Sequence, residues 1–435
     1  MIEIIGAGLA GSEAAYYLAE HGEKVTLIDM KPKKFTPAHT SENFSELVCS
    51  NSLKSDDIYG NACGLLKEEM RILGSVTMEA AAHARVPAGG ALAVDRDAFS
   101  KYVTEKLRSH PNIEIVSREV TSLPARGIVA TGPLTSDALS REIAARYGSA
   151  LCFYDASAPI VSADSVDMDY VFTQDRYGRG TGDYLNCPLT KEEYEQFVEE
   201  LVNAERAELH AFEKGEIFEG CMPVEVMASR GKDTLRFGTF KPVGLEIDGV
   251  RPYAVLQLRK ENAAGTSLGL VGCQTNLKFK EQRRVFGLIP ALKHAEFERY
   301  GVMHRNTFLR APEILNADFS AKDNPDLFFA GQMTGVEGYV ESAMSGLLAG
   351  IHVLNRLRHG ATAVPEDTSV CGALSRYIAS PNKDFQPMNA NYGILRDIGR
   401  IRDKKEKRRM YAERALKEIA RFASLAIPEP TQSAE

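Results

Sequence analysis

The chain has 435 residues, of which 44% are hydrophobic and 26% charged, and its net charge is −7. This is an ordinary soluble composition, long enough for two or three domains, and the acidic balance argues against a generally basic nucleic-acid-binding surface. No stretch approaches the roughly 18 apolar residues of a membrane helix, and the start, MIEIIGAG, has no basic leader. We therefore expect a cytoplasmic protein with no membrane partner.

Residues 2–30 carry the strongest local signal. The short apolar run IEII leads into Gly6-x-Gly8-x-x-Gly11, the helix-favouring segment SEAAYYLAEHG follows, and a second strand ends in Asp29. In such a unit the glycines permit a tight turn, close approach of a pyrophosphate, and helix–strand packing, while the acid hydrogen-bonds a ribose. The pattern predicts a bound FAD or NAD, and the predicted turn residues are Gly6, Ala7, Gly8, Leu9, Ala10 and Gly11.

Cys49 stands in ELVCSNSLKS, where apolar residues precede it and polar residues with a nearby cation, Lys54, follow it. A structural cysteine usually has apolar neighbours, whereas polar and cationic surroundings favour the reactive thiolate. The chain has six other cysteines, with no CxxC pair and no cluster at zinc spacing, so we predict neither a disulfide framework nor a metal site.

A change of character marks the middle of the chain. The stretch RGIVATGPLTS (126–136) has the form of a strand and turn at the exit of a nucleotide domain. From about 137 to 320, short strand-like runs alternate with one long predicted helix, KEEYEQFVEELVNAERAELHAFEKG (191–215). We interpret this region as an inserted α+β domain. Within it, Cys221 lies in the turn-like stretch FEGCMPVE.

Residues 326–350 supply a second nucleotide signal. The strand LFFAG is followed by a glycine-rich loop and the small-residue helix ESAMSGLLAG. Flavoproteins often close their FAD site with such a strand, which favours FAD over NAD. The residues predicted to contact the cofactor here are Gly331, Gln332, Gly338 and Tyr339.

Residues 396–421 hold eleven Lys or Arg against five acids in a helix-like arrangement. A solvated helix face is one interpretation, and phosphate contacts with RNA are the other. The predicted RNA-binding residues are Lys404, Lys405, Lys407, Arg408 and Arg409.

Taken together, these patterns predict an α/β fold: a Rossmann-type FAD-binding domain with an inserted α+β domain. The predicted limits are 1–140 and 316–425 for the FAD-binding domain, the second part including the basic C-terminal helices, 141–315 for the insertion, and 426–435 for a disordered tail.

Several blocks together resemble the bacterial folate- and FAD-dependent tRNA (uracil-5-)-methyltransferases, the TrmFO family. The blocks are GAGLAGSEAA, ELVCSNSLKS, PAGGALAVDRDAF, IVATGPLTS, LNCPLT, FEGCMPVEVMA, YGVMHRNTF, FFAGQMTGVEGYVESA and FQPMNANYG. The resemblance runs from about residue 2 to 425.

This resemblance implies methylation of uracil C5 in the T-loop of tRNA, with 5,10-methylenetetrahydrofolate as one-carbon donor, FAD as hydride carrier and NADH or NADPH as reductant. It also implies that Cys221 attacks uracil C6 and that Cys49 works beside the flavin. Alternatives from the same class are a paralogue acting on a ribosomal RNA uridine and a wobble-uridine tRNA-modifying flavoprotein. From other classes, they are a flavin disulfide reductase or NAD(P)H oxidase, and a non-catalytic RNA-binding flavoprotein.

Overall fold

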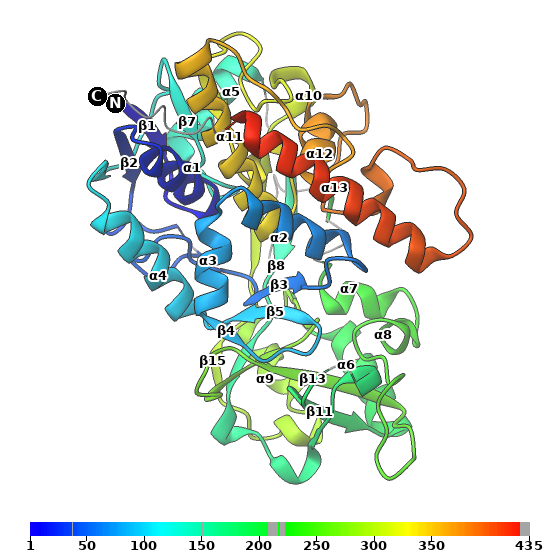
Figure 1. Ribbon diagram of the computed structural model, residues 1–435. Helices are drawn as coiled ribbons and strands as arrows, with labels where there is room; N and C mark the ends of the chain where they lie inside the picture. The colour runs from blue at the N-terminus through cyan, green and yellow to red at the C-terminus, as the bar shows by residue number, and fades with distance from the viewer. Residues whose placement is uncertain (37, 149–150, 179, 208–215, 218–221, 427–435) are drawn as a thin grey trace.

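The computed structural model describes residues 1–36, 38–148, 151–178, 180–207, 216–217 and 222–426, with side chains for all of these except 151–155, 216–217, 304–307 and 426. The first and last parts of the described chain form an upper lobe, and the middle of the sequence forms a lower lobe (Figure 1). Cys221 and residues 427–435 of the predicted disordered tail lie outside the described residues, whereas Ala426 ends the last helix.

A five-stranded parallel sheet forms the centre of the upper lobe. Its strand order is β17-β7-β1-β2-β6, and the strands are β1 (Ile2–Ile5), β2 (Val25–Asp29), β6 (Ile113–Ser117), β7 (Gly127–Val129) and β17 (Leu327–Phe329). Short apolar runs form these strands because a parallel sheet is covered on both faces. The predicted Rossmann-type sheet is therefore present, and the strand at 327–329 joins it from the far end of the sequence.

Helices α1 (Leu9–Glu20) and α11 (Tyr339–His359) pack against each other in close backbone contact (Figure 1). A Cβ placed on Gly346 would lie 2.0 Å from the carbonyl oxygen of Ala10, and one on Gly350 would lie 3.2 Å from Ala14. Only glycine at 346 permits this approach. The contact brings residues after 330 against the N-terminal glycine turn.

Further helices surround this pair in the upper lobe. They are α2 (Ala62–Ile72), α3 (Val76–His83), α4 (Arg96–Ser109), α5 (Asp137–Tyr147), α10 (Ala311–Ile314), α12 (Val370–Ala379) and α13 (Lys404–Ala426). A small sheet of β3 (Ser52–Ser55), β5 (Ala91–Val94) and β4 (Arg85–Val86) lies at the lower edge of this lobe.

The lower lobe is built on a six-stranded antiparallel sheet. Its strands, in spatial order, are β10 (Phe172–Thr173), β11 (Tyr184–Leu189), β13 (Ala254–Lys260), β14 (Ser267–Leu270), β9 (Ile160–Ser162) and β15 (Phe297–Arg299). Helices α6 (Lys191–Asn203), α7 (Val224–Ser229), α8 (Thr234–Phe237) and α9 (Phe279–Phe286) accompany the sheet. Strands β8 (Leu151–Ala156) and β16 (Met303–Phe308) pair antiparallel between the lobes, and β12 (Glu216–Ile217) pairs with β8.

Each lobe has its own hydrophobic core. The upper core draws on residues 2–143 and 308–422, and the lower core on residues 161–292. These cores support the predicted domain limits near residues 140 and 315, which we keep as a proposal. Within the described ranges, none of the helices combines the length and apolar character that a membrane crossing needs.

The long helix predicted over 191–215 is wrong for residues 204–207, and residues 208–215 of that prediction lie outside the described part of the chain. Helix α6 ends at Asn203, and Ala204 is extended. The chain then pairs with a neighbouring segment, because the Ala207 amide donates to the Asn276 carbonyl and the Lys278 amide to the Glu205 carbonyl. Tertiary hydrogen bonds therefore override the helix-favouring composition.

We predict that Gly346→Ala destabilises the protein although alanine is the better helix former. Helix propensity alone would stabilise the variant by about 1 kcal/mol. The clash with the Ala10 backbone should reverse this and lower the free energy of unfolding by about 1–3 kcal/mol, with loss of bound flavin. Gly350→Ala is the matched control, with a smaller expected loss because its nearest contact is longer. Thermal unfolding that ranks Gly346→Ala as the more stable of the two would contradict this packing argument.

Candidate functional site

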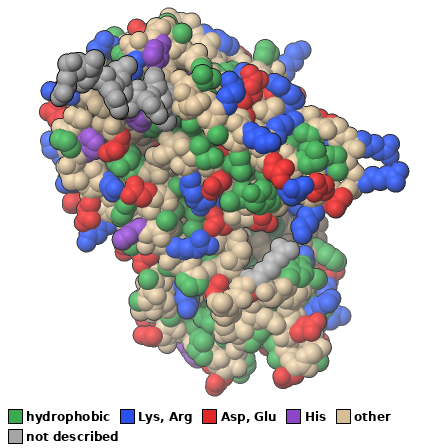
Figure 2. Space-filling view, in the orientation of Figure 1, with side chains coloured by type: hydrophobic (Ala, Val, Ile, Leu, Met, Phe, Trp, Pro, Cys, Tyr) green, Lys and Arg blue, Asp and Glu red, His purple; other side chains and the backbone are tan. Residues whose placement is uncertain are grey.

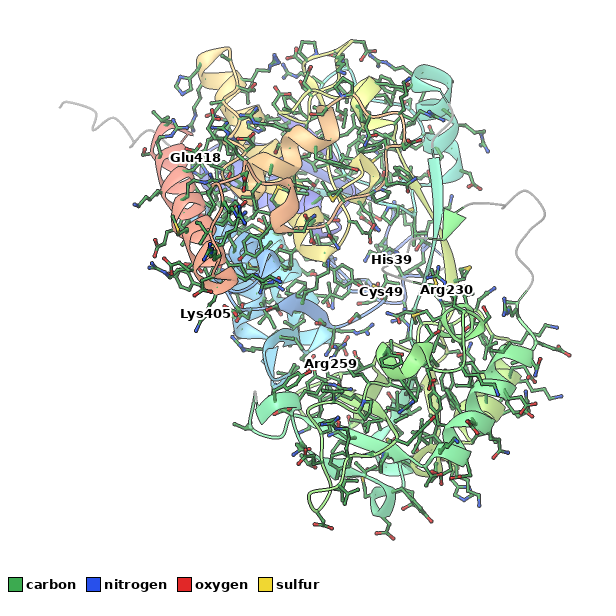
Figure 3. The ribbon with its side chains drawn as sticks, turned by 90° about the vertical axis from the view of Figure 1, so that its right-hand side faces the viewer. His39, Cys49, Arg230, Arg259, Lys405 and Glu418 are labelled. Atoms are coloured by element: carbon green, nitrogen blue, oxygen red, sulfur yellow. The ribbon has the colours of Figure 1, made fainter. Side chains whose placement is uncertain are left out.

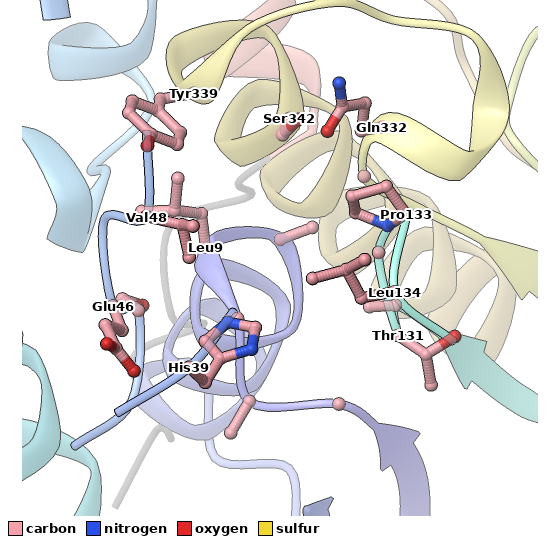
Figure 4. Close-up of a pocket in the computed structure, with 18 of the residues that line it drawn as sticks. Leu9, His39, Glu46, Val48, Thr131, Pro133, Leu134, Gln332, Tyr339 and Ser342 are labelled. Atoms are coloured by element: carbon pink, nitrogen blue, oxygen red, sulfur yellow. The ribbon is translucent and has the colours of Figure 1, made fainter. Parts of the chain in front are cut away.

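A cavity of about 440 Å³ lies beside the β1–α1 turn, at the carboxyl ends of the parallel strands. Its walls come from the start of α1, the end of β2, residues 45–54, the turn after β7, and residues 331–342. Figure 4 shows Tyr339, Val48, Glu46 and His39 on one side and Gln332, Pro133, Leu134 and Thr131 on the other. Segments far apart in the sequence therefore share one site, as expected at the ligand crevice of such a sheet.

Each glycine of the N-terminal turn has the environment that its predicted task requires. Gly6 has a φ of 100°, and a Cβ there would lie 2.5 Å from the Ala130 carbonyl oxygen. A Cβ on Gly11 would lie 1.8 Å from the Gly6 carbonyl oxygen. A Cβ on Gly8 would meet no atom within 4 Å, although Gly8 lines the cavity. The open space is therefore at the second glycine, where a pyrophosphate would approach.

Asp29 ends β2 at the cavity wall and holds the turn in place. Its carboxylate accepts hydrogen bonds of 2.8 Å from the amides of Ala7 and Lys31. The predicted residues Leu9 and Ala10 also line the cavity, whereas Gly11 is a packing position. The structure thus brings the predicted turn and its acid together.

The segment after β17 closes the cavity with a second helix N-terminus. Gly331 and Gly338 have φ values of 87° and 118°, and both line the cavity with Gln332 and Tyr339. In the part of the chain that the structure describes, no side chain caps the N-terminus of α1 or of α11. Two uncapped helix N-termini favour a phosphate or an electron-rich ring edge. The glycine cradle and these termini fit an FAD, as predicted.

Cys49 lies against Tyr339 at the wall of this cavity. The amides of Cys49 and Ser50 donate to the Tyr339 hydroxyl oxygen over 2.7 and 3.3 Å, and that oxygen is 3.0 Å from the Cys49 sulfur. Burial, followed by the Cys49 charge, raises the pKa of Tyr339 well above 10. The phenol therefore keeps its proton, and since its oxygen already accepts from two amides, the proton is available for the sulfur. Such a donor stabilises a thiolate.

The cation expected beside Cys49 is engaged elsewhere. Lys54 pairs with Glu341 at 3.3 Å, and although burial alone would lower the pKa of Lys54, the charge of Glu341 raises it. Arg299 is a cation in electrostatic range of Cys49: burial lowers the pKa of Arg299, while the charge of Cys49 favours its protonated form. The insertion thus supplies a positive charge that local sequence could not reveal.

His39 is a cavity residue that sequence reasoning missed. It lies on the wall opposite Thr131 and Leu134 (Figure 4), and burial, then the charge of Lys31, lowers its pKa. The imidazole is therefore neutral at neutral pH and can stack or hydrogen-bond without carrying charge. Its surroundings in the sequence, TPAHTSEN, contain no periodic signal that could have marked it.

The other thiols whose side chains the structure describes do not line this cavity. Cys63, Cys187, Cys273 and Cys371 are buried. Burial raises the pKa of Cys187 to about 12 and that of Cys273 still further. Burial also raises the pKa of Cys63, although Lys67 Nζ lies 3.6 Å from its sulfur, and burial raises the pKa of Cys371 well above 9, with Glu69 beside it. No cluster of three or more metal-ligating side chains occurs in the part of the chain that the structure describes.

The basic C-terminal segment, predicted as helix-like over 396–421, is helical only from Lys404, where α13 begins, and some of its charges are already paired. Lys407 pairs with Asp397 at 3.0 Å, and Arg409 contacts Glu406 and Glu413 at 2.7 and 2.6 Å. Lys404 and Lys405 are exposed and have no ion pair with any described residue, while Arg408 is exposed and donates to the Gly60 carbonyl. Figure 2 shows Lys and Arg side chains mixed with acids around this helix, above a hollow between the lobes.

Comparisons with known proteins agree on one family. The family model described as Glucose inhibited division protein A matches residues 1–361. Proteins named Methylenetetrahydrofolate--tRNA-(uracil-5-)-methyltransferase TrmFO are 55% identical in Lactobacillus delbrueckii subsp. bulgaricus and 56% identical in Acetivibrio thermocellus. Each alignment covers 97% of this chain and 98% of the relative. A third, from Streptococcus pneumoniae, is 54% identical over 98% of this chain and 99% of its own length.

A solved structure supports the fold. GidA from Aquifex aeolicus superposes with a TM-score of 0.72 at 16% sequence identity, over 98% of this chain and 74% of GidA. At this identity the likeness concerns the fold, namely a parallel-sheet domain with an inserted sheet.

We predict that Tyr339→Phe slows alkylation of Cys49 by iodoacetamide about 10-fold at pH 7. The variant removes the hydroxyl 3.0 Å from the sulfur, a charge-assisted donor worth about 1.5 kcal/mol to a thiolate. Mass spectrometry of the Cys49 peptide across pH gives the rate. Tyr392→Phe is the matched control, because its buried hydroxyl has no hydrogen-bond partner among the described residues. Equal rates in wild type and Tyr339→Phe would show that the phenol does not stabilise the thiolate.

Proposed function

The chain belongs to the TrmFO family of methylenetetrahydrofolate–tRNA-(uracil-5-)-methyltransferases, and we propose that it uses the FAD cavity and two cysteines to methylate uracil C5 in the T-loop of tRNA. Identity of 54–56% over nearly the whole chain carries this conclusion. The cysteine against Tyr339 at the wall of the cavity adds a reactive group where the chemistry needs one.

The chemistry needs a nucleophile because uracil C5 is weakly nucleophilic by itself. A thiolate that adds to C6 makes an enolate, and C5 then attacks the electrophilic one-carbon unit of methylenetetrahydrofolate. Removal of the C5 proton expels the tetrahydrofolate amine from the transferred carbon and leaves an exocyclic methylene with the thiol still on C6; the thiolate leaves C6 once this methylene has been reduced. When bound, reduced FAD supplies the hydride that converts this methylene to methyl. NADH or NADPH is the proposed source of the electrons.

The two cysteines have different proposed roles. Cys221, which lies outside the described residues, is the proposed nucleophile at C6 on the basis of the family resemblance. Cys49 is the proposed group beside the flavin that handles the C5 proton. The Tyr339 hydroxyl holds the Cys49 sulfur and supports its charged form. His39, neutral and half-buried in the same wall, is suited to contact an uncharged ring.

Two alternatives are less well supported. A flavin disulfide reductase needs a reactive dithiol, and the chain has no CxxC pair. The near-full-length relatives are named for tRNA, which favours tRNA over a ribosomal RNA target. Ribosomal RNA is the second substrate to test beside tRNA.

We expect the purified protein to form 5-methyluridine in an unmodified tRNA transcript with methylenetetrahydrofolate and NAD(P)H, detected by mass spectrometry. Cys221→Ala and Cys49→Ala should each lose at least 100-fold in rate, since each removes a reacting thiol. Cys187→Ala, a buried thiol of the lower core, is the control. Activity in Cys221→Ala would remove that residue as the nucleophile, and methylation of ribosomal RNA alone would change the substrate.

We also propose that Lys404 and Lys405 contact tRNA phosphates. Lys404→Gln/Lys405→Gln should weaken tRNA binding and reduce the slope of log K against log salt by about 0.7–0.9 for each lost contact. Filter binding at several salt concentrations measures both quantities. Lys24→Gln/Lys101→Gln removes the same charge from exposed positions elsewhere on the upper lobe. If both double variants bind alike, α13 is an ordinary solvated helix.

A further inference from the structure

A second, smaller cavity lies on the lower-lobe side of Cys49. It has a volume of about 150 Å³ and shares Cys49, Ser50 and Gln274 with the FAD cavity. The remainder of its wall includes Arg96, Arg259, Glu261 and residues 158–160 and 269–272. Figure 3 shows Cys49 at the lower edge of the upper lobe and Arg259 below it at the top of the lower lobe. We call this cavity the lower chamber.

One wall of the lower chamber is a buried Arg–Glu–Arg row. Glu261 accepts from Arg96 Nε at 2.9 Å, and its other oxygen lies 3.9 Å from Arg259 Nη2. The three side chains are 15%, 7% and 11% exposed for Arg96, Glu261 and Arg259. A Cβ on Gly269 would lie 2.1 Å from Glu261 Oε1, so the chain leaves room for this carboxylate.

The same arginines hold the loop that carries Cys49. Arg96 Nη1 donates to the carbonyls of Leu47 and Val48 over 3.0 and 3.1 Å. Arg259 donates from Nε to Asn51 Oδ1 at 2.8 Å and from Nη2 to Ser50 Oγ at 3.0 Å. The row therefore fixes the chamber wall and the cysteine loop together.

Each side chain of the row has one polar atom that is free to hydrogen-bond a ligand. Among the described residues, Arg96 Nη2, Arg259 Nη1 and Glu261 Oε1 have no hydrogen-bond partner, and none of these atoms is sealed from solvent. These atoms offer a ligand a hydrogen-bond donor from Arg96, an acceptor from Glu261 and a second donor from Arg259. This wall favours a ligand with the opposite pattern, because polar groups that a ligand shields from solvent are costly when the ligand leaves them unmatched.

We infer that the lower chamber receives the flipped uracil ring of the RNA substrate, with its imide edge against the Arg–Glu–Arg row. The edge of uracil that pairs in RNA presents an acceptor, a donor and an acceptor at O2, N3–H and O4, which complements the row. Enzymes that act on a flipped base read this same edge. This inference rests on the proposed function and names the substrate pocket for it.

Size and charge favour uracil over other ligands. A cavity of about 150 Å³ holds one six-membered ring such as benzene, so a bicyclic pterin with its aryl tail is too large. Cytosine presents an unprotonated N3, which would face the Glu261 carboxylate. That carboxylate also opposes binding of a phosphate between the arginines.

The orientation suits the reaction. C5 and C6 lie opposite the imide edge in the pyrimidine ring, so they face away from the row and toward the remaining walls. Those walls include Cys49 and Gln274, which the chamber shares with the FAD cavity. The Val224 amide donates to the Gln274 carbonyl at 2.7 Å, so the described chain that resumes at Met222 starts beside the same border.

The direct test is a crystal of the FAD-loaded protein soaked in 5-bromouridine 5′-monophosphate, with 5-bromocytidine 5′-monophosphate as the matched ligand. We expect anomalous bromine density in the lower chamber for the uridine and none for the cytidine. Density for the uridine outside the chamber, or equal density in the chamber for both bases, would overturn the inference. This readout needs no methyl transfer, so it stays decisive if the proposed activity fails.

The second test uses Glu261→Gln, with Glu199→Gln on the outer face of α6 as control. Glu261→Gln should lower kcat/KM for tRNA methylation about 10- to 100-fold, as expected for a lost hydrogen bond to a charged group. The tRNA Kd should change less than twofold, because phosphate contacts lie elsewhere. Arg259→Lys, which keeps the charge but loses the planar fork, should behave similarly. If the wild-type protein is active and both variants keep its kcat/KM, the inference is overturned and the proposed function stands. If the wild-type protein is inactive, only the proposed function is refuted.

Discussion

The backbone contact between α1 and α11 is the constraint on which the site depends. Gly346 lets α11 approach the Ala10 carbonyl, and this approach sets the N-terminus of α11 beside that of α1. The cavity is the space left between these two helix ends and the turn after β7. Because the walls of the cavity come from both the N-terminal and the C-terminal parts of the sequence, neither the N-terminal glycine turn nor the C-terminal strand could form the cavity by itself.

The Cys49 loop is a junction between the two lobes. Tyr339 holds it from above through the Cys49 and Ser50 amides, and Arg259 holds it from below through Ser50 and Asn51. A shift of the lower lobe would therefore move the thiol relative to the flavin site. This connection explains how an inserted domain can supply substrate contacts and still keep the reacting groups in register.

The charges of α13 illustrate a limit of reading function from a basic stretch. Lys407 and Arg409 are satisfied by acids of their own segment, and such surface pairs contribute little to stability. They also offer less net charge to a phosphate. The exposed Lys404 and Lys405 have uncompensated positive charges, so the N-terminal end of α13 is the part of the helix best suited to contact RNA phosphates.

Much of the nucleotide site could be predicted from the sequence, because its signals are local. The turn of Gly6, Gly8 and Gly11, the acid at 29 and the strand at 327–329 follow from backbone conformations and burial patterns within short windows. By contrast, the end of α6 at Asn203 depends on pairing with residues 276–278, which lie outside any such window.

The sequence by itself determined the parallel-sheet domain, the cofactor turn and the identity of the cysteine with polar neighbours. Only the tertiary structure decided what surrounds that cysteine. Tyr339 is 290 residues away from Cys49, Lys54 is drawn to Glu341, and the Arg–Glu–Arg row joins position 96 to positions 259 and 261. The physical reason is that local sequence encodes backbone preference and burial, whereas the partners of a polar group depend on how separate helices and sheets pack together.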